Sequence, residues 1–239
     1  MKLIRFFAIF FFNVIDKLIH QKRILLCLKK KKLNINCFID VGSHRGTYTD
    51  LIIKNFKVNK VLMFEPQKYI FKIIKKKYKN YKFIKIFNNA ISNKNKLQKI
   101  YINRHDLTSS LTKLDETNPY LKHKAKLFAS NNTQSLIKKT YDVKTIRLND
   151  IIKKNDIKKI DLLKIDTEGH ELQVLIGLSK SIKKVSFILI EFHRNKIYFN
   201  YSSKKIHNYL IKNSFVLEDT FKFPFTYWED RFYKNKKFK

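Results

Sequence analysis

Glycine, proline and cysteine are scarce in this chain. Its 239 residues contain four glycines, three prolines and two cysteines, Cys27 and Cys37. No CxxC pair and no histidine cluster accompany these cysteines, which excludes a zinc-ribbon type of site, and they give no sign of a disulfide framework. The cysteine content therefore predicts a protein that works in a reducing, cytoplasmic setting.

Long apolar runs are also missing. The run Phe6–Phe12 is much shorter than the roughly 20 residues that a membrane-spanning helix needs, and no small-residue cleavage site follows it. We expect residues 1–35 to be a basic, aromatic-rich helical extension packed on the main domain. An alternative stays open, in which this helix lies on the inner membrane face with Lys29–Lys32 beside anionic headgroups.

Acidic residues are few. Asp and Glu number 19 against 52 Lys and Arg, which gives a formal net charge of +33. Such a field attracts nucleic acid, anionic lipid and acidic glycans. A genome rich in A and T would produce the same excess of Lys, Asn, Ile, Phe and Tyr without any basic binding surface. Because the lysines are spread along the whole chain, we favour this second explanation, and charge alone does not lead us to expect nucleic acid as a partner.

The remaining composition fits one folded domain, since 44% of the residues are hydrophobic and 14% aromatic. From residue 36 onward, short apolar runs alternate with helical patterns. This alternation predicts an α/β domain over 36–239, with a mostly parallel sheet, antiparallel additions and helices on both faces. We expect a long loop over 103–140, and the expected strands are 37–41, 60–66, 81–87, 96–102, 141–148, 160–166, 185–193, 215–223 and 226–234.

Two of the four glycines stand close together in the segment FIDVGSHRGTYTD, residues 38–50. Gly42 follows an apolar strand and Gly46 opens the next helix, so the backbone can turn tightly and a ligand can approach it. The spacing is GxxxG, which lacks the central glycine that admits a pyrophosphate in GxGxxG sites. Glu65 ends the next strand, roughly 20 residues on, where doubly wound folds place a carboxylate that receives ribose hydroxyls. The pattern favours a cofactor that contains adenosine but no diphosphate.

Several stretches, in this order, resemble the FkbM family of methyltransferases: FIDVGSHRGTYT, FEP, NNAIS, SSL, LLKIDTEGHELQVLIG and ILIEFH. They run from about Cys37 to His193, and KIDTEGHE is the most specific of them. The resemblance implies a class I, Rossmann-like fold, S-adenosylmethionine as cofactor, and O-methylation of a hydroxyl on a sugar or glycan, a lipid or a related metabolite. Ser43–His44 and Asn149 depart from the common family pattern but leave both glycines intact.

The resemblance also implies roles for individual residues. Glu168 and Glu191 match the acids that follow the fourth and end the fifth parallel strand. The residues expected to contact the cofactor are Asp40, Gly42, Ser43, Gly46, Glu65, Asn89, Ala90 and Asp166. The residues expected to contact the substrate are Ser109, Ser110, His170 and Glu191.

Methyl transfer from a sulfonium needs the acceptor oxygen, the methyl group and the sulfur in line, and a base for the acceptor's proton. We expect Asp166 to place the acceptor or the amine of the methyl donor, and His193 or Glu168 to take the proton. His193 could instead be an ordinary histidine at a strand end, and His170 could simply open a helix. A divalent ion is conceivable with so many carboxylates, but no spacing of histidines and carboxylates demands one, so no metal residue is assigned.

Three other functions fit the sequence less well. A base-methylating enzyme acting on RNA or DNA typically has a Pro–Pro–aromatic turn after the fourth strand to stack the flipped base, whereas Asp–Thr–Glu–Gly stands at 166–169. A non-catalytic polyanion- or membrane-binding module would not be expected to retain Asp40, Gly42 and Glu65. A dehydrogenase is disfavoured by the glycine spacing.

Overall fold

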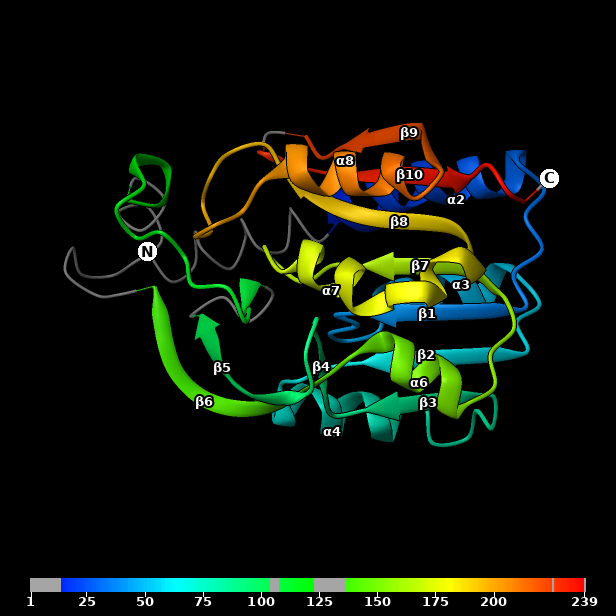
Figure 1. Cartoon of the computed structure of the whole chain (residues 1–239), viewed down its shortest axis with the longest axis horizontal. Coiled ribbons are helices and arrows are strands. Elements are labelled where there is room, and N and C mark those ends of the chain that lie inside the picture. Colours follow the sequence, from blue (N-terminus) through cyan, green and yellow to red (C-terminus); the bar gives the residue numbers. More distant parts are fainter. Residues whose placement is uncertain (1–13, 104–107, 123–135, 225, 239) are drawn as a thin grey trace.

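The computed structural model describes residues 14–103, 108–122, 136–224 and 226–238. A seven-stranded sheet forms its centre, with five neighbouring parallel strands and two further strands at one edge (Figure 1). In spatial order the strands are β3 (Ile84–Phe87), β2 (Lys60–Phe64), β1 (Cys37–Val41), β7 (Ile160–Ile165), β8 (Val185–His193), β10 (Trp228–Asn235) and β9 (Phe215–Lys222). Strand β10 is antiparallel to both of its neighbours. The expected mostly parallel α/β sheet with antiparallel additions is thus confirmed.

A smaller sheet of three strands extends beyond the carboxyl ends of the parallel strands (Figure 1). Its members are β4 (Ala90–Ile91), β6 (Ile137–Ile146) and β5 (Lys96–Asn103). The expected strand at 141–148 therefore begins four residues earlier and ends two residues earlier. Pairing with β5 extends it at the start through lysines that point to solvent, and a helix already begins at Leu148. The expected loop over 103–140 is shortened accordingly, and its residues 104–107 and 123–135 lie outside the described part of the chain.

Helices cover both faces of the central sheet, as expected. One face carries α6, α7 and α8, and the other carries α2, α3 and α4. The described helices are η1 (Asp16–His20), α2 (Gln21–Lys30), α3 (Thr47–Asn55), α4 (Lys68–Lys77), α6 (Leu148–Lys154), α7 (Glu171–Leu178), η3 (Ser179–Lys184) and α8 (Ser203–Lys212).

The apolar core lies between the central sheet and these helices. Strands β1 and β7 are buried along their whole length, which is why their sequences are almost continuously apolar rather than alternating. Ile39 of β1 faces α6 and α7, while its neighbour Phe38 faces α2, α3 and α4, because successive side chains of a strand point to opposite faces. Helix α4 shows the matching helical pattern, with Ile70 and Ile74 buried and lysines outward.

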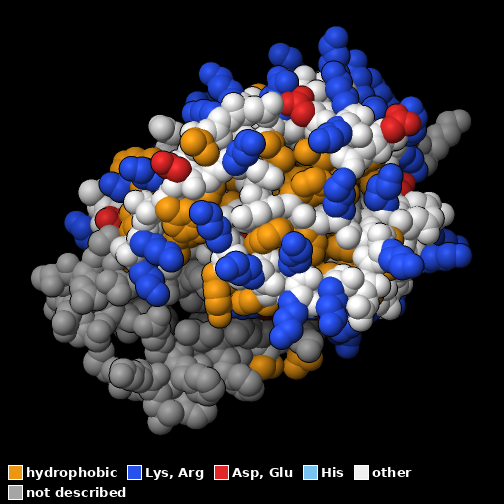
Figure 2. Space-filling model, turned by 90° about the horizontal axis from the view of Figure 1, so that it is seen from below, with side chains coloured by type: hydrophobic (Ala, Val, Ile, Leu, Met, Phe, Trp, Pro, Cys, Tyr) orange, Lys and Arg blue, Asp and Glu red, His pale blue; other side chains and the backbone are white. Residues whose placement is uncertain are grey.

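Basic side chains are scattered over the face along β3 and α4, where they stand among uncharged and apolar groups (Figure 2). Lys72, Lys75 and Lys76 of α4 are exposed. No single basic stripe is visible on the face shown in Figure 2.

Among the described residues, no helix has both the length and the apolar character needed to cross a lipid bilayer. The first 13 residues, which include the run Phe6–Phe12, lie outside the described part of the chain. The cytoplasmic location and the membrane contact of the amino-terminal extension stay predictions.

Candidate functional site

Strands β1 and β7 lie side by side at the centre of the sheet, and the chain leaves them toward opposite edges. Open α/β sheets bind ligands at such a switch point, outside the carboxyl ends of the strands. Gly42 directly follows β1 with φ +81°, and a Cβ atom on it would lie 1.7 Å from the carbonyl oxygen of Asp166, the first residue after β7. The Asp166 N–H donates to the carbonyl of Val41 at 3.0 Å. The two loops therefore touch through their backbones, and only glycine fits at position 42.

Gly46 begins the helix that follows this turn. Its φ is +75°, and a Cβ would lie 2.3 Å from the hydroxyl oxygen of Tyr78. Its N–H donates to the carbonyl of Ser43 at 2.7 Å, and the Ser43 side chain is buried with its hydroxyl 3.4 Å from the carbonyl of Phe64. The glycine turn is thus held in one conformation by its own bonds.

Glu65 follows β2 and is only 2% exposed. Its Oε2 accepts a bond from the His44 N–H at 2.9 Å, and its Oε1 accepts one from the Gln67 N–H at 2.7 Å. The carboxylate is therefore fixed beside the glycine turn, where the sequence places the ribose contact. Asn88 supports it by donating to the carbonyls of Glu65 and Pro66 at 2.9 and 3.2 Å. Sequence reasoning missed Asn88, although the pair Asn88–Asn89 was visible as a strand stop.

Asn89 and Ala90 lead from β3 into β4 at the same edge of the sheet. The Asn89 amide donates to the carbonyl of Lys144 at 3.3 Å, and Ala90 is buried opposite Thr145 of β6. Their expected contact with the adenine stays a prediction.

Asp40 points into the protein beneath the glycine turn. It is 2% exposed and accepts a bond from the Thr49 hydroxyl of α3 at 2.7 Å. Burial raises the pKa of its carboxyl to about 6, against the lowering effect of the Thr49 bond and of Lys164. Asp40 therefore ties β1 to α3 and carries negative charge close to the turn at neutral pH.

A buried charge network lies beside Asp40, and sequence reasoning missed it. Lys164 Nζ is 2.8 Å from Asp230 Oδ1 and 3.3 Å from Asp166 Oδ2. The other oxygen of Asp230 accepts from the Tyr48 hydroxyl at 2.6 Å and lies 2.9 Å from His20 Nε2. Burial alone would lower the pKa of Lys164, but the carboxylates of Asp166 and Asp230 raise it overall. One feature of the sequence could have indicated this network: a lysine stands inside the apolar run IDLLKI, and a buried lysine needs a charged partner.

Three of the expected site residues meet at the carboxyl ends of β7 and β8. His193 Nε2 lies 3.3 Å from Glu191 Oε2 and 3.6 Å from Glu168 Oε2. The Tyr198 hydroxyl donates to the same Glu168 oxygen. Burial raises the pKa of both glutamates well above the usual range. The charge of Asp166 adds to the rise at both, and the charge of Glu191 adds to it at Glu168. We call Glu168, Glu191 and His193 the acid–histidine cluster.

The expected substrate residues Ser109 and Ser110 are bonded within the protein. Ser110 is buried and its hydroxyl donates to the carbonyl of Thr167 at 3.0 Å, while the Ser109 hydroxyl accepts from the Asn103 N–H at 3.2 Å. Ser110 thus holds the 108–114 segment against the loop after β7. The structure shows this internal hydrogen bond of Ser110, and direct contact of Ser109 and Ser110 with substrate stays a prediction.

His170 is also bonded on both sides of its ring. Its Nε2 is 3.0 Å from the Ser92 hydroxyl and its Nδ1 is 3.2 Å from the Thr112 hydroxyl. Burial lowers the pKa of its imidazole to about 4, and the charge of Lys96 adds to the effect. The ring is therefore neutral at physiological pH and joins three segments around the site.

Because the unfolded chain protonates His170 near its ordinary pKa, acid should destabilise the fold through this residue. The stabilisation is complete above pH 6.5 and is lost as the pH falls toward 4. We expect the free energy of unfolding to fall by about 2 kcal/mol from this group between pH 7 and 4.5. Urea denaturation of the native protein and of His170→Gln across this range measures it. Equal pH dependence in both proteins would contradict the assignment.

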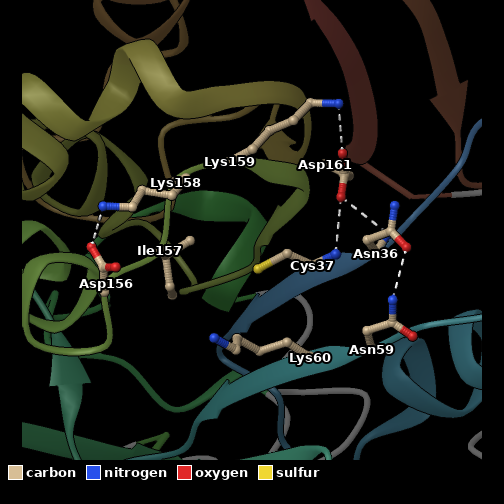
Figure 3. Close-up of a pocket in the computed structure, with 9 residues that line it drawn as sticks. All are labelled: Asn36, Cys37, Asn59, Lys60, Asp156, Ile157, Lys158, Lys159 and Asp161. Carbon is tan, nitrogen blue, oxygen red and sulfur yellow. Dashed lines mark hydrogen bonds and ion pairs between the residues drawn. The ribbon is translucent and has the colours of Figure 1, made fainter.

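A hollow of about 340 Å³ lies at the opposite, amino edge of the sheet (Figure 3). Asp161 there accepts bonds from the N–H groups of Asn36 and Cys37 and lies 2.9 Å from Lys159. None of the residues expected at the active site lines this hollow. The residues that carry chemistry gather instead at the carboxyl edge, where the glycine turn, Glu65, Asp166 and the acid–histidine cluster lie.

Comparison with known proteins identifies the family of this chain. The sequence profile described as "Methyltransferase FkbM domain" matches residues 40–218, from the acid before the glycine turn to β9. The chain belongs to the FkbM family of methyltransferases. The expected cofactor, S-adenosylmethionine, is confirmed by this family membership. The glycine turn after β1 and the carboxylate of Glu65 lie side by side, an arrangement suited to that cofactor.

One curated relative matches this FkbM-family chain over a short stretch. It is the hexuronic acid methyltransferase AglP of Haloferax volcanii, which is 35% identical over 51 residues. The match covers 21% of this chain and 21% of AglP. It therefore spans only about a fifth of the relative's length.

Solved structures show the fold. The FkbM methyltransferase of Methylobacillus flagellatus KT matches with a TM-score of 0.54 and 14% identity over 84% of this chain, which spans 43% of that protein. Magnesium protoporphyrin IX methyltransferase of Synechocystis PCC 6803, solved with S-adenosylmethionine bound, gives 0.50 and 10% over 90% and 78% of the two chains. A methyltransferase of Aquifex aeolicus gives 0.50 and 12% over 93% of each. The expected class I methyltransferase fold is thus confirmed.

Proposed function

We propose that this FkbM-family methyltransferase methylates a hydroxyl oxygen of a sugar or glycan, with a uronic-acid-containing glycan as the first acceptor to test. The observation that carries the proposal is the convergence of Asp166 and the acid–histidine cluster beside the glycine turn. A hydroxyl gives up its proton reluctantly, so its methylation benefits from bases placed at the acceptor. The short match with a hexuronic acid methyltransferase supports a sugar as the acceptor class.

The cofactor supplies a methyl group on a positively charged sulfur, which is already activated for displacement. The protein's part is to bind, align and remove a proton. In our proposal Glu65 and the glycine turn hold the cofactor, and Asp166 positions the acceptor where the loops after β1 and β7 touch. Glu168 and His193 stand next to Asp166 to receive the acceptor's proton, while the carbon–oxygen bond forms and the carbon–sulfur bond breaks.

The bonding within the site supports these roles. Lys164 Nζ lies 3.3 Å from Asp166 Oδ2, and the side chain of Asp166 is 30% exposed. Glu168 has the positive φ of 55°, an uncommon conformation for a residue other than glycine. Strained backbone of this kind is concentrated at functional sites. The acceptor side of the proposed site is thus formed by few residues in a fixed arrangement.

We expect the purified protein to transfer labelled methyl from S-adenosylmethionine to oligosaccharides that contain a hexuronic acid. Asp166→Asn should lower turnover by about 100-fold or more, because it removes a group placed at the acceptor. Transfer is measured by scintillation counting of the recovered oligosaccharide, with neutral oligosaccharides of the same length as the control acceptor.

Treatment of the labelled product with mild alkali then tests which kind of oxygen carries the methyl group. A methyl ether survives it, whereas a methyl ester is hydrolysed. Alkali-labile label would place the methyl group on a carboxylate and contradict the hydroxyl assignment. Transfer to no glycan at all, by protein that binds the cofactor, would contradict a sugar acceptor.

A further inference from the structure

The acid–histidine cluster has the composition of a metal site. Glu168, Glu191 and His193 each offer one ligand atom, and these three atoms lie within 4.8 Å of one another. We propose that they bind one divalent cation that prefers oxygen and nitrogen ligands, such as Mn²⁺ or Mg²⁺.

The local fold aims the three side chains at one point. Glu191 and His193 are two residues apart on β8, so they lie on the same face of the sheet. Glu168 comes from the loop after the neighbouring strand β7, where its positive φ of 55° turns the chain back. Parallel neighbouring strands end at the same edge, which brings the loop of one strand beside the last residues of the other.

Two buried atoms of the cluster lack a hydrogen-bond partner among the described residues. They are Glu191 Oε2 and His193 Nε2, whose residues are 6% and 5% exposed. The two atoms face each other across 3.3 Å. Buried polar atoms in folded proteins are nearly always hydrogen-bonded, so two atoms that share an ion-pair contact but no hydrogen bond indicate a ligand that completes them.

The charges around the cluster also require compensation. The ligand atoms of Glu168 and Glu191 lie within 4.8 Å of each other, and the two side chains are 15% and 7% exposed. A divalent cation would balance two ionised glutamates and take the imidazole of His193 as a third ligand.

The hydroxyl of Tyr198 completes the arrangement. It donates to Glu168 Oε2, and its ring packs edge-on against His193 with centroids 4.9 Å apart. Hydrogen bonds from outside the ligand set orient metal ligands in this way. The three ligands would therefore be held in place before the cation binds.

Three protein ligands leave coordination positions for oxygens of the acceptor. A bound cation lowers the pKa of a coordinated hydroxyl or water and fixes its orientation. With the cation bound, Glu168 and His193 would serve as its ligands, and Asp166 would replace them in the proton-accepting role given under the proposed function. This use of the cation rests on the proposed function, whereas cation binding itself does not.

Mn²⁺ alone, added to the purified full-length protein, tests the site. Calorimetry and electron paramagnetic resonance should show one Mn²⁺ per chain, and Mg²⁺ should displace it. Pulsed measurements should detect coupling of Mn²⁺ to an imidazole nitrogen in the native protein, which no carboxylate-only surface site produces. Absence of tight Mn²⁺ binding, or of nitrogen coupling, would overturn the proposal.

Matched variants locate the bound ion. Glu168→Gln and Glu191→Gln keep the side-chain size and should each weaken Mn²⁺ binding by about tenfold or more. Asp156→Asn removes one exposed carboxylate from the amino edge of the sheet and should leave binding unchanged. Equal weakening by all three, or by none, would place the ion elsewhere. The nitrogen coupling of the native protein decides the question if a glutamine variant does not fold.

The same samples separate this proposal from the proposed function. Mn²⁺ binding without methyl transfer to glycans would leave the cation site standing and reject the acceptor class. Methyl transfer to a glycan hydroxyl that is unaffected by removal of all divalent cations, together with no Mn²⁺ binding, would reject the cation site alone.

Discussion

Replacement of Gly42 by alanine is expected to abolish detectable binding of S-adenosylmethionine and to lower the free energy of unfolding by about 4 kcal/mol. The backbone there has φ +81°, which disfavours any side chain, and the new Cβ would lie 1.7 Å from the carbonyl oxygen of Asp166. The loops after β1 and β7 would have to separate, which displaces the acceptor-side carboxylate from the cofactor turn. Urea denaturation and calorimetric titration of the cofactor measure the two effects.

Ser43→Ala is the control for the stability effect of Gly42→Ala, because it changes the next residue of the same turn at a position without positive φ. Ser43 is itself an expected cofactor contact, so only the unfolding of the two variants is compared. The Ser43 hydroxyl bond to the carbonyl of Phe64 is long at 3.4 Å. We expect its loss to cost about 0.5 kcal/mol. If Gly42→Ala bound the cofactor and unfolded like the native protein, the close contact between the two loops would not exist in solution.

Glu65→Gln is expected to weaken S-adenosylmethionine binding by about 10- to 100-fold. The native carboxylate accepts bonds from the N–H groups of His44 and Gln67. A glutamine keeps one acceptor oxygen but turns an NH₂ group toward the other N–H. The variant therefore loses one fixing bond to the turn and one of the two acceptor oxygens proposed to bind the ribose hydroxyls.

Glu218→Gln provides the matched control for Glu65→Gln. Glu218 lies on the edge strand β9 and pairs with Lys31, far along the sheet order from β2. Isothermal titration of S-adenosylmethionine into the two variants should show weakening only for Glu65→Gln. Unchanged affinity in Glu65→Gln would remove Glu65 from the cofactor site and leave the ribose contact to another residue.

Much of the fold could be predicted from local sequence. Residues 37–41 and 160–165 are apolar runs between helical patterns, and such runs become buried parallel strands whatever the details of their neighbours. The glycines were informative because the chain contains so few. Gly42 and Gly46 both have positive φ and both lie against another chain segment, so a side chain at either position would be strained. The strand boundaries of β6 were harder, since its early residues are polar and pair with β5 only in three dimensions.

The cofactor side of the site could be predicted from the sequence, whereas the prediction of the rest of the site was incomplete. Glu65 stands at a fixed interval after the glycine turn, so its place followed from chain order. Lys164 and Asp230 are 66 residues apart, and His20 joins them from the amino-terminal helices. No local pattern connects residues so distant, because their contact depends on which strands become neighbours in the sheet.

Local sequence was enough to predict the family, the order of most strands and helices, and the glycine turn that we propose holds the cofactor. These depend on short-range spacing and on backbone geometry, which each segment carries alone. Only the tertiary structure decided that Glu168, Glu191 and His193 meet, that two of their atoms lack hydrogen-bond partners among the described residues, and that His170 and Ser110 are bonded within the protein. The reason is physical: distances between side chains at the ends of different strands are set by how the strands pair and how their loops pack.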